Sequence, residues 1–348
     1  MERGEDLVGE VEGEYTVEEG RVKIPLDFKR DESKIIALST DADRFGAAPA
    51  AVHAVASEAD AGVVYDEDRV IARSTAAGLF STTLDSGMEY DSSFPAVPAQ
   101  IDLTGATWNL AAEDWKAANP WATTFGASAT QTTKDQVSVT LSGLKPWRQI
   151  PELVNASGIG LYTTTFSLPE SWSADNGAII DLGTVVDTFT LSVNGIAVPV
   201  DQTTSRVDLR DQLKAGENTL SVRIATTLVN RLATYDTAVN NRGHYQNYGL
   251  LGPVVVSPYA SVEIDYVAPR ITSVELDTRQ RIVIQATDDL SGVARIEYST
   301  QKGKQAASPW VEYTGPLQVD AATTVSIRVV DSAGNVSEIT QVNRKDLR

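Results

Sequence analysis

The sequence predicts an all-β protein made of tandem β-sandwiches, and three observations support this class. Phe189, Leu191 and Val193 alternate with polar residues, which places one face of a strand on a core and the other in water. Short segments of this kind recur along the chain, with Gly, Pro and Asn between them. No stretch reads as a long amphipathic helix. We therefore expect strands to form nearly all of the regular structure.

The composition describes a folded and acidic chain. Of its 348 residues 42% are hydrophobic, which supports packed cores in two or three domains. The formal net charge is -18, so the sequence predicts neither nucleic-acid binding nor attraction to an anionic membrane. No apolar run approaches ~18 residues, so we expect no membrane insertion. Cysteine is absent, which excludes disulfides and thiol catalysis.

Residues 1–97 are predicted to form a first β-sandwich, the tail of a domain that begins upstream of this chain. The Ala-rich segment 45–62 has helical propensity, but its valines favour irregular strands. Two prolines and two serines in 92–98 indicate a linker. The expected strands in this region cover 14–17, 21–28, 34–39, 64–65, 69–74 and 78–84.

Residues 98–262 are predicted to form the central sandwich. Pro169 ends a strand that carries Tyr162 and Phe166 on its apolar face. Asn194-Gly195 predicts a tight hairpin directly after the strand at 188–193, because both residues tolerate positive φ. Further strands are expected at 101–110, 137–141, 220–224 and 254–256.

The central sandwich carries a resemblance to a known family. Its aromatic-rich strand, its Val193-Asn194-Gly195 turn and the pattern Asp208-x-x-x-x-Leu-x-x-Gly-x-Asn218 resemble the galactose-binding-like jelly roll of many glycoside hydrolases, best known as the sugar-binding domain of family 2. The segments 144–153, 157–162 and 248–254 resemble the C-terminal region of α-L-rhamnosidases of glycoside hydrolase family 106. This resemblance covers about residues 100–260.

Residues 263–348 are predicted to form a third sandwich. Short strands are expected at 282–288, 293–299 and 325–331, at the spacing of a sandwich. The turns at 288–293, 313–316 and 331–335 resemble those of bacterial immunoglobulin-like modules, which usually act as spacers or adhesion units.

The sequence names no catalytic residue. In the family that the chain resembles, the catalytic carboxylates sit on a (β/α)-barrel, and no alternation of strands and helices is seen here. Glu113, Asp114 and Glu152 lie beside aromatic residues, but clustered carboxylates are often structural. The resemblance therefore implies an accessory portion of a secreted bacterial hydrolase, with its catalytic domain upstream.

The best ligand candidates are aromatic and polar residues that follow the predicted strands. A sugar offers apolar C–H faces and many hydroxyls, so it is bound by flat rings together with polar groups. Two interpretations stay open, carbohydrate binding and packing against another domain. The candidate carbohydrate-binding residues are Trp147, Arg148, Arg231, Tyr235, Asn241, Arg242, His244, Tyr245 and Tyr248.

No cofactor is required by this interpretation, although jelly rolls of the resembled type often hold structural Ca²⁺. Oxygen ligands for it are predicted from aspartates near strand ends, namely Asp181, Asp187, Asp201 and Asp208. The expected partners are a plant or bacterial polysaccharide, an upstream catalytic domain, or both, at an extracellular or cell-surface location. The alternative hypothesis is a structural or adhesion protein of the cell surface without hydrolase activity.

Overall fold

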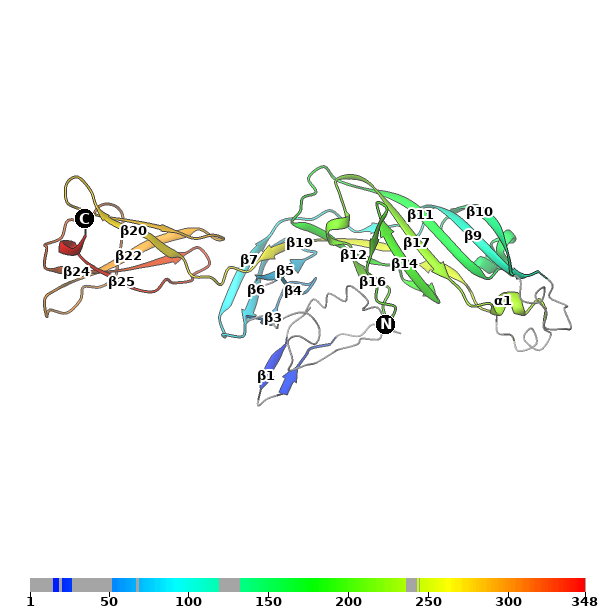
Figure 1. Cartoon of the computed structure of the whole chain (residues 1–348), viewed down its shortest axis with the longest axis horizontal. Helices are drawn as coiled ribbons and strands as arrows, with labels where there is room; N and C mark the ends of the chain where they lie inside the picture. The colour runs from blue at the N-terminus through cyan, green and yellow to red at the C-terminus, as the bar shows by residue number, and fades with distance from the viewer. Residues whose placement is uncertain are drawn as a thin grey trace. The chain divides into compact units, whose positions relative to one another are not determined.

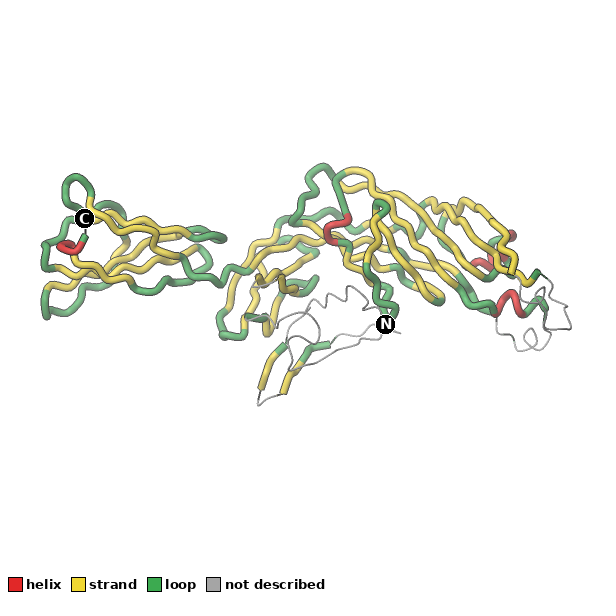
Figure 2. Tube along the Cα trace, in the orientation of Figure 1, coloured by secondary structure: helices red, strands yellow, loops and turns green. Residues whose placement is uncertain are grey.

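The computed structural model describes residues 15–18, 21–26, 52–66, 69–118, 132–235, 243 and 245–347. Nearly all of its regular structure is strand, with short helical turns (Figures 1 and 2). The chain divides into two compact units, residues 1–80 with 93–262, and residues 81–92 with 263–348. The predicted all-β class with tandem sandwiches is confirmed. Within the described residues no helix is long and apolar enough to cross a membrane.

The first unit contains two large antiparallel sheets. One has the order β10-β9-β11-β17-β14-β15 and the other the order β16-β12-β19-β5-β4, with β8 beside β19. The strands of the first sheet are β9 (Thr107–Ala117), β10 (Thr132–Ser142), β11 (Gly158–Leu168), β14 (Thr188–Val193), β15 (Ile196–Val198) and β17 (Gly216–Ala225). Those of the second are β4 (Val63–Asp66), β5 (Arg69–Ser74), β8 (Ile101–Asp102), β12 (Asn176–Asp181), β16 (Arg206–Asp208) and β19 (Val255–Glu263).

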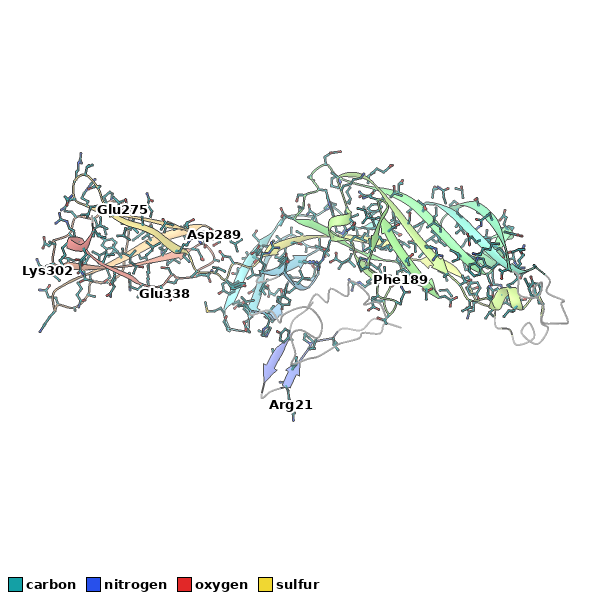
Figure 3. All side chains as sticks on the ribbon, in the orientation of Figure 1. Arg21, Phe189, Glu275, Asp289, Lys302 and Glu338 are labelled. Carbon is teal, nitrogen blue, oxygen red and sulfur yellow. The ribbon has the colours of Figure 1, made fainter. Side chains whose placement is uncertain are left out.

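One hydrophobic core joins both sheets, because alternate residues of each strand point inward. Burial alternates along β11 and β14, and Phe189, labelled in Figure 3, is a buried member of β14. Trp108 and Tyr162 are fully buried and meet edge to face. As predicted, β11 ends at Leu168, directly before Pro169.

The predicted hairpin is also present. Val193 pairs with Ile196 across the turn, and Asn194 and Gly195 have φ of 53° and 82°. Positive φ at both central residues is what a two-residue turn of type I′ requires. The side chain of Asn194 fixes this turn further, because it donates to Gln212 O and to Asn218 Oδ1 at 2.8 and 2.9 Å.

Short elements complete the first unit. The segment predicted as irregular strand contains β3, and the predicted strand at 34–39 lies outside the described residues. These elements are β1 (Thr16–Glu18), β2 (Arg21–Lys23), β3 (Ala54–Ser57), β13 (Thr184–Val186), β18 (Gly249–Gly252), the 3-10 helices η2 (Trp147–Gln149), η3 (Pro151–Leu153) and η4 (Arg210–Gln212), and α1 (Val229–Leu232). Two more strands, β6 (Gly78–Leu84) and β7 (Glu89–Phe94), cross the division between the units.

The grouping of the strands differs from the three predicted domains. The sequence predicts β4 and β5 in a separate first sandwich, yet these strands extend the sheet that holds β12 and β19. Arg73 of β5 donates to Asp208 at 2.7 Å, so a buried ion pair reinforces this sheet extension. A pairing between strands so distant in sequence leaves no local signal.

The second unit has its own core. A two-stranded sheet of β20 (Arg270–Leu276) and β21 (Ile282–Thr287) accompanies a four-stranded sheet in the order β23-β22-β24-β25. The latter strands are β22 (Val293–Lys302), β23 (Val311–Glu312), β24 (Thr323–Asp331) and β25 (Thr340–Asn343), followed by η5 (Arg344–Asp346). Ile282, Ile284, Val325 and Ile327 form the centre of this core. The immunoglobulin-like character stays a prediction.

Candidate functional site

The segment 147–153 forms two successive 3-10 turns that anchor the candidate site. A 3-10 helix has three residues per turn, so residues three apart share a face. Trp147, Ile150 and Leu153 have this spacing and are buried. Arg148, the next residue after the first anchor, is exposed. The local backbone therefore divides this segment into a buried face and a solvent face.

Trp147 lies in the core rather than in a ligand site. Its indole N–H donates to the Tyr162 hydroxyl at 2.7 Å, and its backbone N–H donates to Tyr248 O at 2.9 Å. Its ring lies so close to Gly160 that an added Cβ there would come within 2.5 Å of Cζ2. Trp147 and Tyr248 are both fully buried, so neither offers a ring face to a ligand in this structure.

This finding corrects the sequence-based interpretation of Trp147 and Tyr248. An aromatic residue in a polar segment suggests a sugar platform, but the hydrophobic gain from burying a large ring dominates here. The hydroxyl of Tyr248 is satisfied inside the protein, because it lies 2.6 Å from Thr227 Oγ1.

The described residues 226–235 and 245–248 are joined to each other by hydrogen bonds. Asn230 of α1 is fully buried, donates to Gln246 O and accepts from Gln246 N, both at 2.8 Å. Asp187 accepts a hydrogen bond from Thr227 N at 2.8 Å. Reciprocal amide pairing of this kind satisfies buried polar groups and fixes the backbone. Tyr245 directly precedes Gln246, whose backbone is fixed by its two hydrogen bonds with Asn230.

Arg231 belongs to a buried polar cluster. Its guanidinium pairs with Asp114 of β9, and its backbone N–H donates to Ser157 Oγ at 3.2 Å. Asp114 also accepts from Ser157 N at 3.3 Å and lies 3.3 Å from Lys116 Nζ. Arg231 Nε is buried, with no hydrogen-bond partner in the described part of the chain. Arg231 and Lys116 both pair with the carboxylate of Asp114, and the pairing with this buried residue holds the side chain of Arg231 inward.

Arg148 and Tyr245 form an exposed pair. The guanidinium carbon of Arg148 lies 4.2 Å from the centroid of the Tyr245 ring, which is a cation–π arrangement. Arg148 is exposed and Tyr245 is half-buried. Of the nine predicted residues these two meet at the surface, and Arg231 lies in the neighbouring buried cluster. Tyr235 lies just beyond α1, whereas Asn241, Arg242 and His244 lie outside the described residues.

Two of the three carboxylates that the sequence brought to attention, Glu113 and Asp114, are structural in their contacts, and Glu152 is exposed. Glu113 accepts from the Trp115 indole N–H at 3.2 Å, and this hydrogen bond holds the pKa of Glu113 below its usual value. A general acid of a glycosidase needs a raised pKa instead. Asp114 is committed to Arg231 and Lys116.

The four aspartates named as Ca²⁺ ligands do not fit a shared site. Asp181 accepts from Gly183 N and Ser205 Oγ, and Asp201 accepts from Thr203. Asp187 is bonded to Thr227 and Asp208 to Arg73. Each carboxylate therefore serves a separate protein donor, and Ca²⁺ needs six to eight oxygens around one point. The expectation of structural Ca²⁺ stays a prediction without a located site.

Another group of carboxylates was missed by the sequence reasoning. Asp265, Asp288 and Asp331 of the second unit have oxygens within 4.8 Å of one another. Backbone N–H groups of Val267, Ser291, Gly292 and Asn335 donate to them. Asp288 directly follows β21 and Asp331 ends β24, in segments that the sequence identified only as turns. Asp289, the next residue after Asp288, is labelled in Figure 3.

A second missed cluster surrounds Asp208. Besides Arg73, it accepts from Arg210 Nε at 3.0 Å and from the Tyr259 hydroxyl at 2.6 Å. Burial and the negative charge of Asp208 raise the pKa of Tyr259. The residues of this Asp208 cluster come from β5, β16, η4 and β19, so no sequence motif links them.

These features define an all-β, tandem-sandwich protein in which the Arg148–Tyr245 pair lies at the surface of the first unit. No protein-family model and no curated protein matches the sequence. Several solved structures that align with it are glycoside hydrolases. A rhamnosidase from Novosphingobium sp. PP1Y aligns at 20% identity over 60% of this chain and 22% of its own, with a TM-score of 0.34.

Two further alignments are of the same kind. A β-glucuronidase from Ruminococcus gnavus aligns at 14% identity over 70% of this chain and 45% of its own, with a TM-score of 0.31. A GH2 β-galacturonidase from Eisenbergiella tayi aligns at 16% identity over 72% and 44%, with a TM-score of 0.31. The chain spans less than half the length of each of these enzymes. Values this low establish neither a family nor an activity for this chain.

Proposed function

We propose that this chain is a non-catalytic accessory portion of a secreted bacterial glycoside hydrolase, similar to an α-L-rhamnosidase, and that its first unit binds carbohydrate. The observation that carries the proposal is the exposed Arg148–Tyr245 pair, held on a rigid base at one end of the sandwich. The proposed partners are a plant or bacterial polysaccharide and an upstream catalytic domain, in an extracellular or cell-surface setting.

The pair has the chemistry that a sugar requires. The Tyr245 ring orients the guanidinium that covers its face, and the guanidinium donates several hydrogen bonds in one plane to the hydroxyls of a sugar. The backbone beneath the pair is fixed by the Trp147–Tyr248 hydrogen bond and by the Asn230–Gln246 clamp. A site fixed in advance binds more tightly, because less conformational entropy is lost when the ligand arrives.

A glycan array probed with the full chain tests the proposal. We expect binding to at least one plant or bacterial polysaccharide and its loss in Tyr245→Ala. Trp172→Ala, which removes an aromatic residue that packs against the core from elsewhere in the first unit, is the control for general damage. Failure to bind any glycan would contradict the carbohydrate-binding role.

A second candidate function is a scaffold or cell-surface adhesion unit without a ligand. The observation that favours it is that polar groups of Thr227, Asn230 and Arg231 are bonded to other protein groups rather than turned to solvent. A catalytic domain fused to this chain would then gain stability rather than affinity for polysaccharide. A raised melting temperature of that domain, without glycan binding, would favour this alternative.

A further inference from the structure

Arg148 has no anionic partner among the described residues. Its contact is with the Tyr245 ring, and it forms no ion pair in that part of the chain. Basic side chains of the adjacent β9 and β10 strands behave differently. Lys116 pairs with Asp135 at 2.6 Å, and Lys134 lies 3.8 Å from Glu113. Among the described residues, therefore, no carboxylate neutralises Arg148, although the formal net charge of the chain is -18.

The position of Arg148 leaves its hydrogen-bonding edge available. A guanidinium that lies against an aromatic ring is weakly hydrated on its face, while its N–H groups point outward in the plane. Such a fork matches the two oxygens of a carboxylate, which it binds with two parallel hydrogen bonds. A neutral hydroxyl needs only one of these donors.

We propose that the Arg148–Tyr245 pair selects sugars that carry a carboxylate, namely the uronic acid residues of an acidic polysaccharide. This inference rests on the proposed carbohydrate-binding function and assigns its ligand class. The ring of Tyr245 holds the guanidinium against its face, and Arg148 binds the carboxylate through its outer edge with a bidentate hydrogen bond. The acidic chain repels polyanions in general, so this local contact supplies the selectivity.

The experiment compares polygalacturonate with its methyl ester, using calorimetry on the full chain at one ionic strength and without divalent cations. We expect the wild type to bind polygalacturonate more tightly than the ester by roughly tenfold, the effect of one charge-assisted bidentate contact. Arg148→Gln should abolish this preference. Arg148→Lys should lose most of it, because an ammonium cannot form the planar fork.

Matched controls separate the site from general electrostatics. Arg206→Gln removes the same charge from an exposed residue of β16, which belongs to the other sheet, and should leave both affinities unchanged. Tyr245→Leu removes the ring that orients the guanidinium and should lower the preference for the acid over the ester. Because Arg148 is exposed, its variants should melt like the wild type.

The uronate inference would be overturned if the wild type bound the acid and the ester equally, or if Arg206→Gln lost the preference for the acid as fully as Arg148→Gln. Carbohydrate binding itself would stand in both cases. Absence of binding to both polymers, together with binding to a neutral glycan on the array, would overturn the inference alone. Absence of binding to every glycan would overturn the proposed function with it.

Discussion

The buried Arg73–Asp208 pair is expected to hold strands β4 and β5 onto the central sandwich. The test is Arg73→Met, which keeps the length of the side chain and removes its charge. The side chains of Arg73 and Asp208 are 7% and 21% exposed, and their N–O distance is 2.7 Å. Arg73 also lies over the Tyr259 ring, 5.0 Å from its centroid.

The structure sets the expected magnitude. Removing one partner of a fully buried pair costs about 3–5 kcal/mol, because the other charge stays buried without compensation. Here Asp208 is partly exposed and keeps donors from Arg210 and Tyr259. We therefore expect Arg73→Met to lower the free energy of unfolding of the first unit by about 2–3 kcal/mol.

Urea unfolding gives the free energy, and hydrogen exchange locates the change. Amides of 63–74 should exchange faster in Arg73→Met, while those of β11 and β17 should change less, since they lie in the other sheet. A double-mutant cycle with Asp208→Asn should give a coupling energy of about 1–2 kcal/mol. Arg69→Met on the same strand is the control, because its pair with Asp66 is 52% and 55% exposed and should cost at most ~1 kcal/mol.

Three results would refute this reasoning. The first is a loss of unfolding free energy in Arg73→Met that is smaller than the loss in Arg69→Met. The second is a coupling energy of zero in the double-mutant cycle, and the third is unchanged hydrogen exchange of the amides of 63–74. Each would mean that backbone pairing alone holds β5 in the sheet.

Three further predictions concern stability. Trp147→Ala should cost about 3–5 kcal/mol in urea unfolding, as expected for a fully buried large ring, and a loss under ~1 kcal/mol would contradict its core position. Burial raises the pKa of Tyr162 to about 12, so above its unfolded pKa near 10 the unfolded chain releases a proton that the folded chain keeps. The free energy of unfolding should therefore fall by about 2–3 kcal/mol between pH 10 and 12 from this residue, and Tyr162→Phe should flatten that part of the profile measured by urea unfolding. Asn335→Ala removes two side-chain hydrogen bonds, to Asp331 and Asp265, and the acceptor of the Tyr90 hydroxyl, so the melting temperature of the second unit should drop by several degrees; a drop confined to the first unit would be inconsistent with these contacts.

Local sequence determined the class of this protein and much of its central sandwich. The alternation through Phe189, Leu191 and Val193 fixes a strand with one buried face, since side chains alternate with period two. Asn194-Gly195 fixes the turn, because only residues that tolerate positive φ fit there. Pro169 ends its strand because it has no N–H for the ladder. Each of these signals acts between near neighbours in the chain.

Tertiary structure alone decided which candidate residues reach solvent. Trp147 and Arg148 are adjacent in sequence, yet the 3-10 turn buries the ring and exposes the guanidinium. Tyr245 meets Arg148 across almost one hundred positions, and Asp208 meets Arg73 across 135. Composition indicates which residue types suit a site, but burial and distance between remote segments depend on how the sheets pack.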